Sequence, residues 1–297
     1  MAFLAMLMGL ALAGSALQEP ETATQVEDVV VQGGRIDDQV RHFIDEVAAP
    51  PTGRGPARWR DRICVGVANI RREEAQYVLD RVSQAALDIG LNPGEPGCRP
   101  NILIIGASDG AAMARGLVET RRSVFLPGGS GMNRSRAALT AFQQGDRAVR
   151  WWHVSTPTDS DTGQRAARLP DERAPMMNSR IGASRLRTVI RNDLSWVVII
   201  LDLVHAEGLN FQQLADYAAM VALAQVDPDA DVNGYDSVLG LFANAEVQGL
   251  TDWDKAYLKA LYAAELNQSA ASHQLAELRR LMARDRKQNE GLEVDEP

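Results

Sequence analysis

The stretch Ser195 to Val226, SWVVIILDLVHAEGLNFQQLADYAAMVALAQV, decides the fold. Its first part, Trp196 to Leu203, is a nearly unbroken apolar and β-branched run of strand length, which predicts a strand buried on both faces of a sheet. From Phe211 onward the apolar residues recur three and four apart, as on one face of a helix. Asn210 suits the N-cap of that helix, and Asp227-Pro228 would end it.

The sequence on either side of this stretch predicts the rest of the sheet. Strand-like runs lie at residues 63–68 and 101–106 with a helix at 71–89 between them, and residues 148–155 suit an edge strand. We therefore expect an α/β (α+β) fold, with a mixed, mostly parallel sheet covered by helices. Further helices are expected at residues 36–47, 109–119, 135–144 and 184–193, and a loop at 156–178.

The chain has two cysteines, and their positions predict a disulfide. Cys64 opens the first of these strands, and Cys98 lies just ahead of the second. In a right-handed β-α-β unit the starts of two parallel strands share one edge of the sheet, so the two sulfurs should lie close together. The bridge would stabilise the fold by about 4 kcal/mol in the chain-entropy model. Two unpaired buried thiols are the alternative.

The N-terminus has the pattern of an export signal. Phe3 to Ala13 is an apolar run that is too short to span a membrane, and small residues follow it for cleavage after Ala16. We expect a periplasmic or secreted protein with no transmembrane segment after signal cleavage. The expected division is a signal peptide at 1–16, a flexible lead-in at 17–34, one zincin-like α/β domain at 35–270, and a C-terminal helix with a polar tail at 271–297.

Composition and charge narrow the class of protein. With 45% apolar and 24% charged residues, the chain can bury a substantial core. The net charge of −8 argues against a nucleic-acid partner. Arginine far outnumbers lysine, but no stacking aromatic residues accompany the arginines in a nucleic-acid motif, which favours a solvated surface.

Residues 106–110, Gly-Ala-Ser-Asp-Gly, match the G-x-S-x-G pattern of a nucleophile elbow between a strand and a helix. The pattern resembles the serine site of α/β-hydrolases, with Ser108 as the nucleophile and Asp202 and His205 as its partners. The same small residues suit a tight turn in which Ser108 caps the helix. A hydrolase would need a histidine within hydrogen-bond reach of Ser108. A serine hydrolase is therefore the alternative to a non-catalytic function.

Asp202, His205 and Glu207 follow the central strand, at the edge of the sheet where α/β proteins usually bind ligands, so an acid-based activity is a further alternative. Asp227 to Asn233 alternates acids like the start of an EF-hand loop, but it lacks the glycine and the final glutamate of that loop, so we expect a solvated acidic loop. The four histidines have no metal-ligand spacing, so no histidine zinc site is expected.

The segment Leu250-Thr-Asp-Trp-Asp254-Lys-Ala-Tyr-Leu258-Lys-Ala-Leu261-Tyr262 resembles the L-[S/T]-x-x-D-x-x-x-[L/I]-x-x-L-Y helix that closes the catalytic domain of matrixin-type metzincin proteases. Ahead of it, Asp236 to Leu239 is similar to the segment around their Met-turn, with Leu239 at the methionine position. The order of expected strands and helices also resembles the upper subdomain of that family. The resemblance, over roughly residues 60–265, implies a zincin-like layout.

On this resemblance, the helix that follows the central strand lies where the metzincin zinc helix, H-E-x-x-H-x-x-G, would lie. Ala215 and Ala219 then hold the two histidine positions, Asp216 the glutamate position, Ala222 the glycine position and Gln225 the third-ligand position. Alanine cannot bind zinc, so the resemblance implies a protein with no metal, no other cofactor and no catalytic residues.

The helix 211–226 is otherwise expected to be a core element. Asp216 should lie off its apolar stripe or be hydrogen-bonded, because a buried unpaired carboxylate would cost several kcal/mol. The whole chain also resembles a set of exported alphaproteobacterial proteins of unknown function. We therefore expect an exported, zincin-like pseudoenzyme of the cell envelope that binds a peptide or an envelope protein in the groove beside the edge strand.

Overall fold

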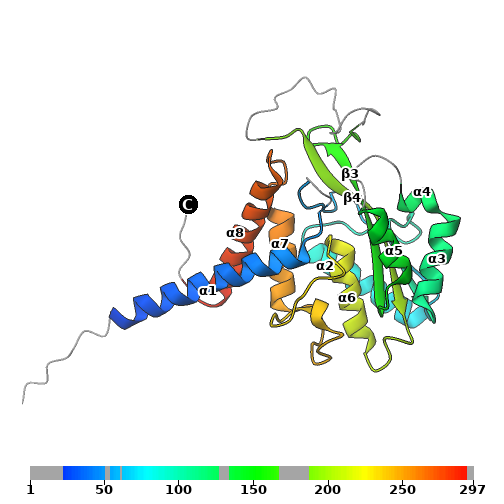
Figure 1. Ribbon diagram of the computed structural model, residues 1–297, viewed down its shortest axis with the longest axis horizontal. Helices are drawn as coiled ribbons and strands as arrows, with labels where there is room; N and C mark the ends of the chain where they lie inside the picture. The colour runs from blue at the N-terminus through cyan, green and yellow to red at the C-terminus, as the bar shows by residue number, and fades with distance from the viewer. Residues whose placement is uncertain (1–22, 51–53, 61, 127–133, 167–186, 293–297) are drawn as a thin grey trace, which may run out of the picture.

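The computed structural model describes residues 23–50, 54–60, 62–126, 134–166 and 187–292. A four-stranded sheet forms the middle layer of the molecule, and helices cover both of its faces (Figure 1). The strands are β1 (Val65–Ala68), β2 (Ile102–Ala107), β3 (Val149–Asp159) and β4 (Ile190–Asp202), in the order β1-β2-β4-β3. Only β3, at one edge, runs antiparallel to its neighbour, so the expected mixed, mostly parallel sheet is confirmed.

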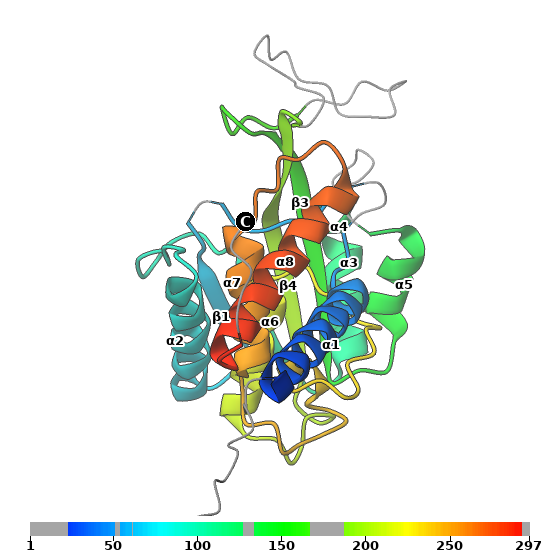
Figure 2. The ribbon, with the colours of Figure 1, turned by 90° about the vertical axis from the view of Figure 1, so that its left-hand side faces the viewer.

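The helices form two groups, one on each face of the sheet (Figures 1 and 2). On one face lie α3 (Gly110–Thr120), α4 (Arg122–Phe125) and α5 (Arg136–Gln144). On the other face lie α2 (Arg72–Asp88) and α6 (Phe211–Leu223). Beyond them α7 (Asp252–Ala263) packs on α6, α8 (Ala271–Asn289) on α7, and α1 (Ala23–Val47) on α8. A short 3₁₀ helix, η1 (Val238–Gly240), contacts α6.

The stretch Ser195 to Val226, which contains most of β4 and all of α6, lies at the centre of this arrangement. Successive residues of β4 alternate between the two cores: Val197 and Ile199 pack with the α6 group, and Val198 and Ile200 with the α3 group. Burial on both faces explains why the strand reads as a continuous apolar run.

Asn210 caps α6 as expected, in a reciprocal capping box with Gln213. The helix ends at Leu223, a little before the expected end, and every residue from Gln213 to Leu223 is buried. The burial extends all round the helix, rather than along one stripe, because α6 lies between the sheet and α7 and also packs on α2.

Cys64 and Cys98 form a disulfide with their Cα atoms 6.0 Å apart, as the β-α-β geometry predicted. The bridge closes the loop that contains α2 at the start of β1.

Two expected elements differ from the structure. The prediction of a short helix at 184–193 is wrong for its described residues. Residues 190–193 are strand in β4, where they pair with residues 156–159 of β3. The same pairing extends β3 into the segment that we expected to be a loop; residues 167–186, the remainder of that region, lie outside the described residues.

The two ends of the chain also bear on the expected division. The expected signal peptide, residues 1–16, lies outside the described residues. The helix expected from residue 36 begins at Ala23, so part of the expected flexible lead-in is helical. The C-terminal helix is present as α8, and Leu278 and Met282 pack in the same core as α6. No helix in the described part of the chain is long and apolar enough to cross a membrane.

Candidate functional site

The positions that the metzincin resemblance assigns to zinc lie in the core. Ala215 and Ala219 are completely buried, and Gln225, just after α6, is 4% exposed. Neither polar atom of the Gln225 side chain has a hydrogen-bond partner within the described residues. Because the methyl group of alanine has no lone pair to donate, two of the three ligand positions cannot bind a zinc ion.

Asp216 is buried, but its carboxylate is fully engaged. It accepts hydrogen bonds from Nε and Nη2 of Arg81 at 2.7 and 2.6 Å, and from the backbone N–H of Leu250 at 3.0 Å. The neighbouring Gly249 permits this approach, since a Cβ there would lie 2.1 Å from Oδ2 of Asp216. The expectation that Asp216 is hydrogen-bonded is confirmed.

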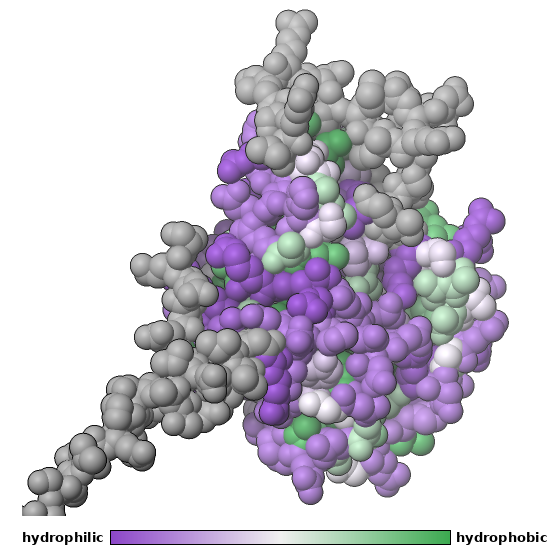
Figure 3. Space-filling view, turned by 60° about the vertical axis from the view of Figure 1, so that its left-hand side comes forward, coloured by the Kyte–Doolittle hydropathy of each residue, from purple (hydrophilic) through white to green (hydrophobic). Residues whose placement is uncertain are grey.

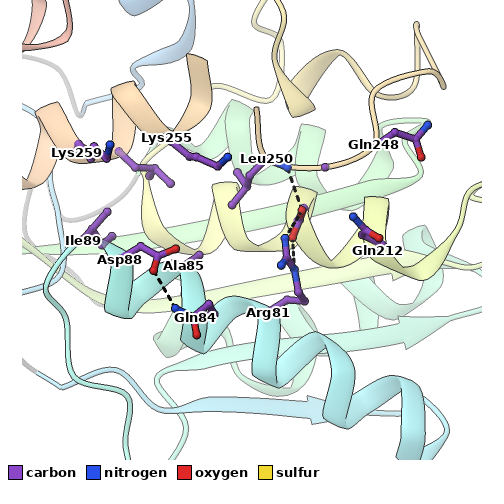
Figure 4. Close-up of a pocket in the computed structure, with 13 residues that line it drawn as sticks. Arg81, Gln84, Ala85, Asp88, Ile89, Gln212, Gln248, Leu250, Lys255 and Lys259 are labelled. Carbon is purple, nitrogen blue, oxygen red and sulfur yellow. Dashed lines mark hydrogen bonds and ion pairs between the residues drawn. The ribbon is translucent and has the colours of Figure 1, made fainter. Parts of the chain in front are cut away.

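Asp216 and Arg81 line a cavity of about 520 Å³, here called the α6 cavity (Figure 4). Its walls come from α2, the start of α6, the loop before α7, and α7 itself. Its apolar lining is Ala85, Ile89, Leu250 and Leu258. Its polar and charged lining is Arg81, Gln84, Asp88, Gln212, Asp216, Gln248, Lys255 and Lys259.

A second polar cluster surrounds Asp202 at the end of β4. Its carboxylate accepts hydrogen bonds from the backbone N–H groups of Gly110 at 2.8 Å and of Val204 and His205 at 3.2 Å each. Nδ1 of His205 lies 3.1 Å from Oδ2. Burial acts to raise the pKa of Asp202, but the hydrogen bonds from Gly110 and His205 outweigh it and hold that pKa below its usual value. The hydrogen bond to Asp202 raises the pKa of His205.

Ser108 is not joined to this cluster. It is exposed, and it makes no hydrogen bond to a histidine within the described part of the chain. The other ring nitrogen of His205, Nε2, faces Asp146 at 3.4 Å, and Glu207 points to solvent as an exposed residue. The structure thus brings Asp202 and His205 together, but it does not form the nucleophile–base pair that a serine hydrolase requires.

The acidic loop after α6 is held by arginines. Arg134 donates to Asp227 at 3.0 Å, and Arg147 donates to Asp229 and to the carbonyl of Pro228. Two carboxylates that would begin a calcium loop are therefore ion-paired. The residues that the structure describes contain no group of three or more histidine, cysteine, aspartate or glutamate side chains positioned to hold a metal.

A groove of about 320 Å³, here called the β3 groove, runs beside the edge strand. It is bounded by α5, by residues 147–153 and by residues 226–229. The aromatic side chains Phe142, Trp151 and Trp152 and the cationic side chains Arg134, Arg147 and Arg150 contribute to its lining. The outer edge of β3 is bridged at Thr158 by Arg165, whereas the described residues place no strand beside 150–153.

Arg81, Lys255 and Lys259 were not predicted as site residues, because each lies on the polar face of an ordinary amphipathic helix. The signal that pointed there was Asp216 itself: an acid within an almost wholly apolar helix needs a partner from another element. The identity of that partner was not readable, since Arg81 lies 135 residues away in the chain.

Comparisons of the chain with protein-family models, with curated proteins and with solved structures found no match.

Proposed function

We propose that this chain is an exported, non-catalytic binding protein of zincin-like layout that holds an extended acidic peptide in the β3 groove. The observation that carries the proposal is the groove itself, which lies along the edge strand and combines arginines with aromatic side chains.

The state of α6 supports a non-catalytic role. A zinc protease needs metal ligands and a carboxylate that is free to act on water. Here the two histidine positions hold buried alanines, and the carboxylate of Asp216 is occupied by Arg81 and Leu250.

Contacts between segment 250–262, which resembles the closing helix of metzincins, and segment 236–239, which resembles their Met-turn, support the zincin-like layout. Asp254, from the closing-helix motif, accepts hydrogen bonds from Ser237 Oγ at 2.6 Å and from the N–H of Val238 at 2.8 Å, both in the segment that resembles a Met-turn. Asp254 also forms a capping box with Thr251 at the start of α7. The residues that carry the resemblance are therefore packed together around one buried carboxylate.

The disulfide supports export. Bridges of this kind persist in oxidising compartments and are rare in the cytosol. The bridge is independent of the expected signal peptide and agrees with it.

The lining of the β3 groove suits an extended peptide. An edge strand can pair its outer backbone groups with an added strand, and side chains around it select the peptide. Tryptophan and arginine are enriched where protein interfaces gain most of their affinity. The arginines favour a peptide with acidic side chains.

The ion pair between Arg147 and Asp229 can be exchanged for one between Arg147 and a carboxylate of the peptide. The side chain of Asp229 is 68% exposed, so its pair with Arg147 contributes little stability. A carboxylate of the peptide could replace Asp229 at Arg147 without a large cost.

Fluorescence anisotropy of a labelled Glu-Val-Glu-Val-Glu-Val peptide tests the proposal. We expect saturable binding, and a loss of roughly tenfold in affinity for Arg147→Gln, because one charge-assisted hydrogen bond is removed. Arg115→Gln is the matched control, an exposed arginine on α3 that lines neither groove nor cavity.

Two competitor peptides make the test specific. A Lys-Val counterpart should not compete, and a peptide that is N-methylated at alternate residues should compete poorly, because it cannot pair with a strand edge. Equal competition by all peptides, or an equal effect of the two arginine substitutions, would contradict binding at the β3 groove.

A further inference from the structure

The α6 cavity gathers positive charge on an acidic protein. Lys255, Lys259 and Lys287 are the only lysines of the chain, and the first two line this cavity together with Arg81. The net charge of the whole chain is −8. Of the two acids of the lining, Asp216 is paired with Arg81, and the exposed Asp88 accepts a hydrogen bond from Gln84 at 2.8 Å. The three cationic side chains therefore outnumber the two acids.

Arg81 is held ready to bind an anion. Its Nε and Nη2 are fixed by Asp216, and its Nη1 has no hydrogen-bond partner among the described residues. The side chain is 36% exposed, and Arg81 lines the cavity. A guanidinium that is already fixed loses less conformational entropy when it binds a ligand.

The two lysines lie four residues apart on α7, and both line the cavity (Figure 4). Their present partners are weak ones. Lys255 pairs with Asp252 across an exposed 3.2 Å contact, and Lys259 lies 3.9 Å from Asp285. Exposed pairs of this kind contribute little, so both ammonium groups can turn to a ligand.

Apolar side chains supply the rest of the surface. Ala85, Ile89, Leu250 and Leu258 line the cavity together with the cationic groups. Its volume of about 520 Å³ lies within the range of small-molecule sites. Cationic groups beside an apolar surface match a molecule that has an anionic head and an apolar body.

We propose that the α6 cavity is a ligand site for a small amphipathic carboxylate, with the carboxylate bound by Arg81, Lys255 and Lys259 and the apolar body against Leu250 and Leu258. This site is separate from the β3 groove, and it does not depend on peptide binding there.

Isothermal titration calorimetry of the purified protein with octanoate tests this inference. We expect one saturable site whose affinity falls as salt is added, because ionic contacts are screened. Octanol, which lacks the charge, and inorganic phosphate, which lacks the apolar body, should each bind at least roughly tenfold more weakly than octanoate.

Substitution of the lysines tests whether octanoate binds in the α6 cavity. The variant Lys255→Gln/Lys259→Gln should bind octanoate about tenfold more weakly. Lys287→Gln is the matched control, because that lysine lies on α8, pairs with Asp37 at 2.9 Å and does not line the cavity. Arg81 is kept intact, since its loss would leave Asp216 buried without its partner.

The inference fails if octanoate gives no saturable binding, if octanol or phosphate binds as well as octanoate, or if the control variant weakens binding as much as the double variant.

Discussion

Arg81 forms an ion pair with Asp216 and so allows this charged carboxylate to lie in the interior of the molecule. Asp216 lies in the buried part of α6, and a lone carboxylate there would be unstable. The bidentate contact with Arg81 and the N–H of Leu250 satisfy it, and the partly exposed guanidinium keeps contact with solvent. The pair therefore stabilises the packing of α2 against α6.

Replacing Asp216 by Asn should lower the free energy of unfolding by about 2 to 3 kcal/mol, because it removes a buried charge from a hydrogen-bonded ion pair. Urea unfolding followed by tryptophan fluorescence measures the change. Asp88→Asn, at an exposed acid of the same cavity, should change stability by less than about 0.5 kcal/mol. Equal effects of the two substitutions would mean that the ion pair contributes little.

His153 predicts a dependence of stability on pH. Burial lowers its pKa to about 4, and its neutral ring donates from Nε2 to the carbonyl of Val221 at 2.6 Å. As the pH falls, His153 is therefore protonated near pH 6.5 in the unfolded chain, but only near pH 4 in the folded chain. Between these values stability should fall with decreasing pH, by at most about 1.4 kcal/mol per pH unit from this group.

The variant His153→Gln should lose that part of the pH dependence, because Gln keeps a donor for Val221 but does not titrate. Urea titrations at a series of pH values between about 4 and about 7 compare the two proteins. Parallel pH profiles for the two proteins would show that His153 is not held neutral by the fold.

At the scale of elements, the disulfide joins the start of β1 to the segment that leads into β2. The bridged residues are separated by 34 positions, and a closed loop of this size should contribute about 4 kcal/mol. Cys64→Ser/Cys98→Ser should therefore unfold at a lower urea concentration, and reduced wild-type protein should behave like the variant. Labelling of two thiols in denatured, unreduced protein would contradict the bridge.

Local pattern was enough for most of the elements. The apolar run of β4 and the three-and-four spacing in α2 and α6 reflect burial within the sheet and beneath it, so these elements were predictable. Residues 190–193 were not, because Arg191, Asn192 and Asp193 lack any strand pattern of their own. They form strand through pairing with residues 156–159, a contact between distant parts of the chain that local propensity cannot show.

The candidate sites were predictable to a smaller extent. The position of Asp202 and His205 at the end of β4 followed from the sheet, but the contact of His205 with Asp146 did not. The edge position of β3 was predicted, with Arg150, Trp151 and Trp152 on that strand, while the other groove residues, Phe142 of α5 and Arg134 and Arg147 from the segments before and after α5, come from elsewhere in the chain. Such convergence of separate elements depends on tertiary packing.

At the scale of the whole molecule, two of the hollows formed by the described residues differ in their chemistry. The β3 groove lies beside the edge strand, and the α6 cavity lies between α2, α6 and α7. On the face drawn in Figure 3, the described residues are mostly hydrophilic, and the hydrophobic ones lie in small, separate groups. Recognition through these two hollows therefore fits the molecule better than recognition through a broad apolar surface of that face.

Under the proposed function, this chain binds a peptide without cleaving it and without a metal. Native mass spectrometry of the purified protein, mixed with a pool of acidic peptides and a trace of zinc, tests that claim most directly. We expect complexes of the protein with intact peptides and no stoichiometric zinc. One zinc bound per chain, or complexes with shortened peptides, would contradict it.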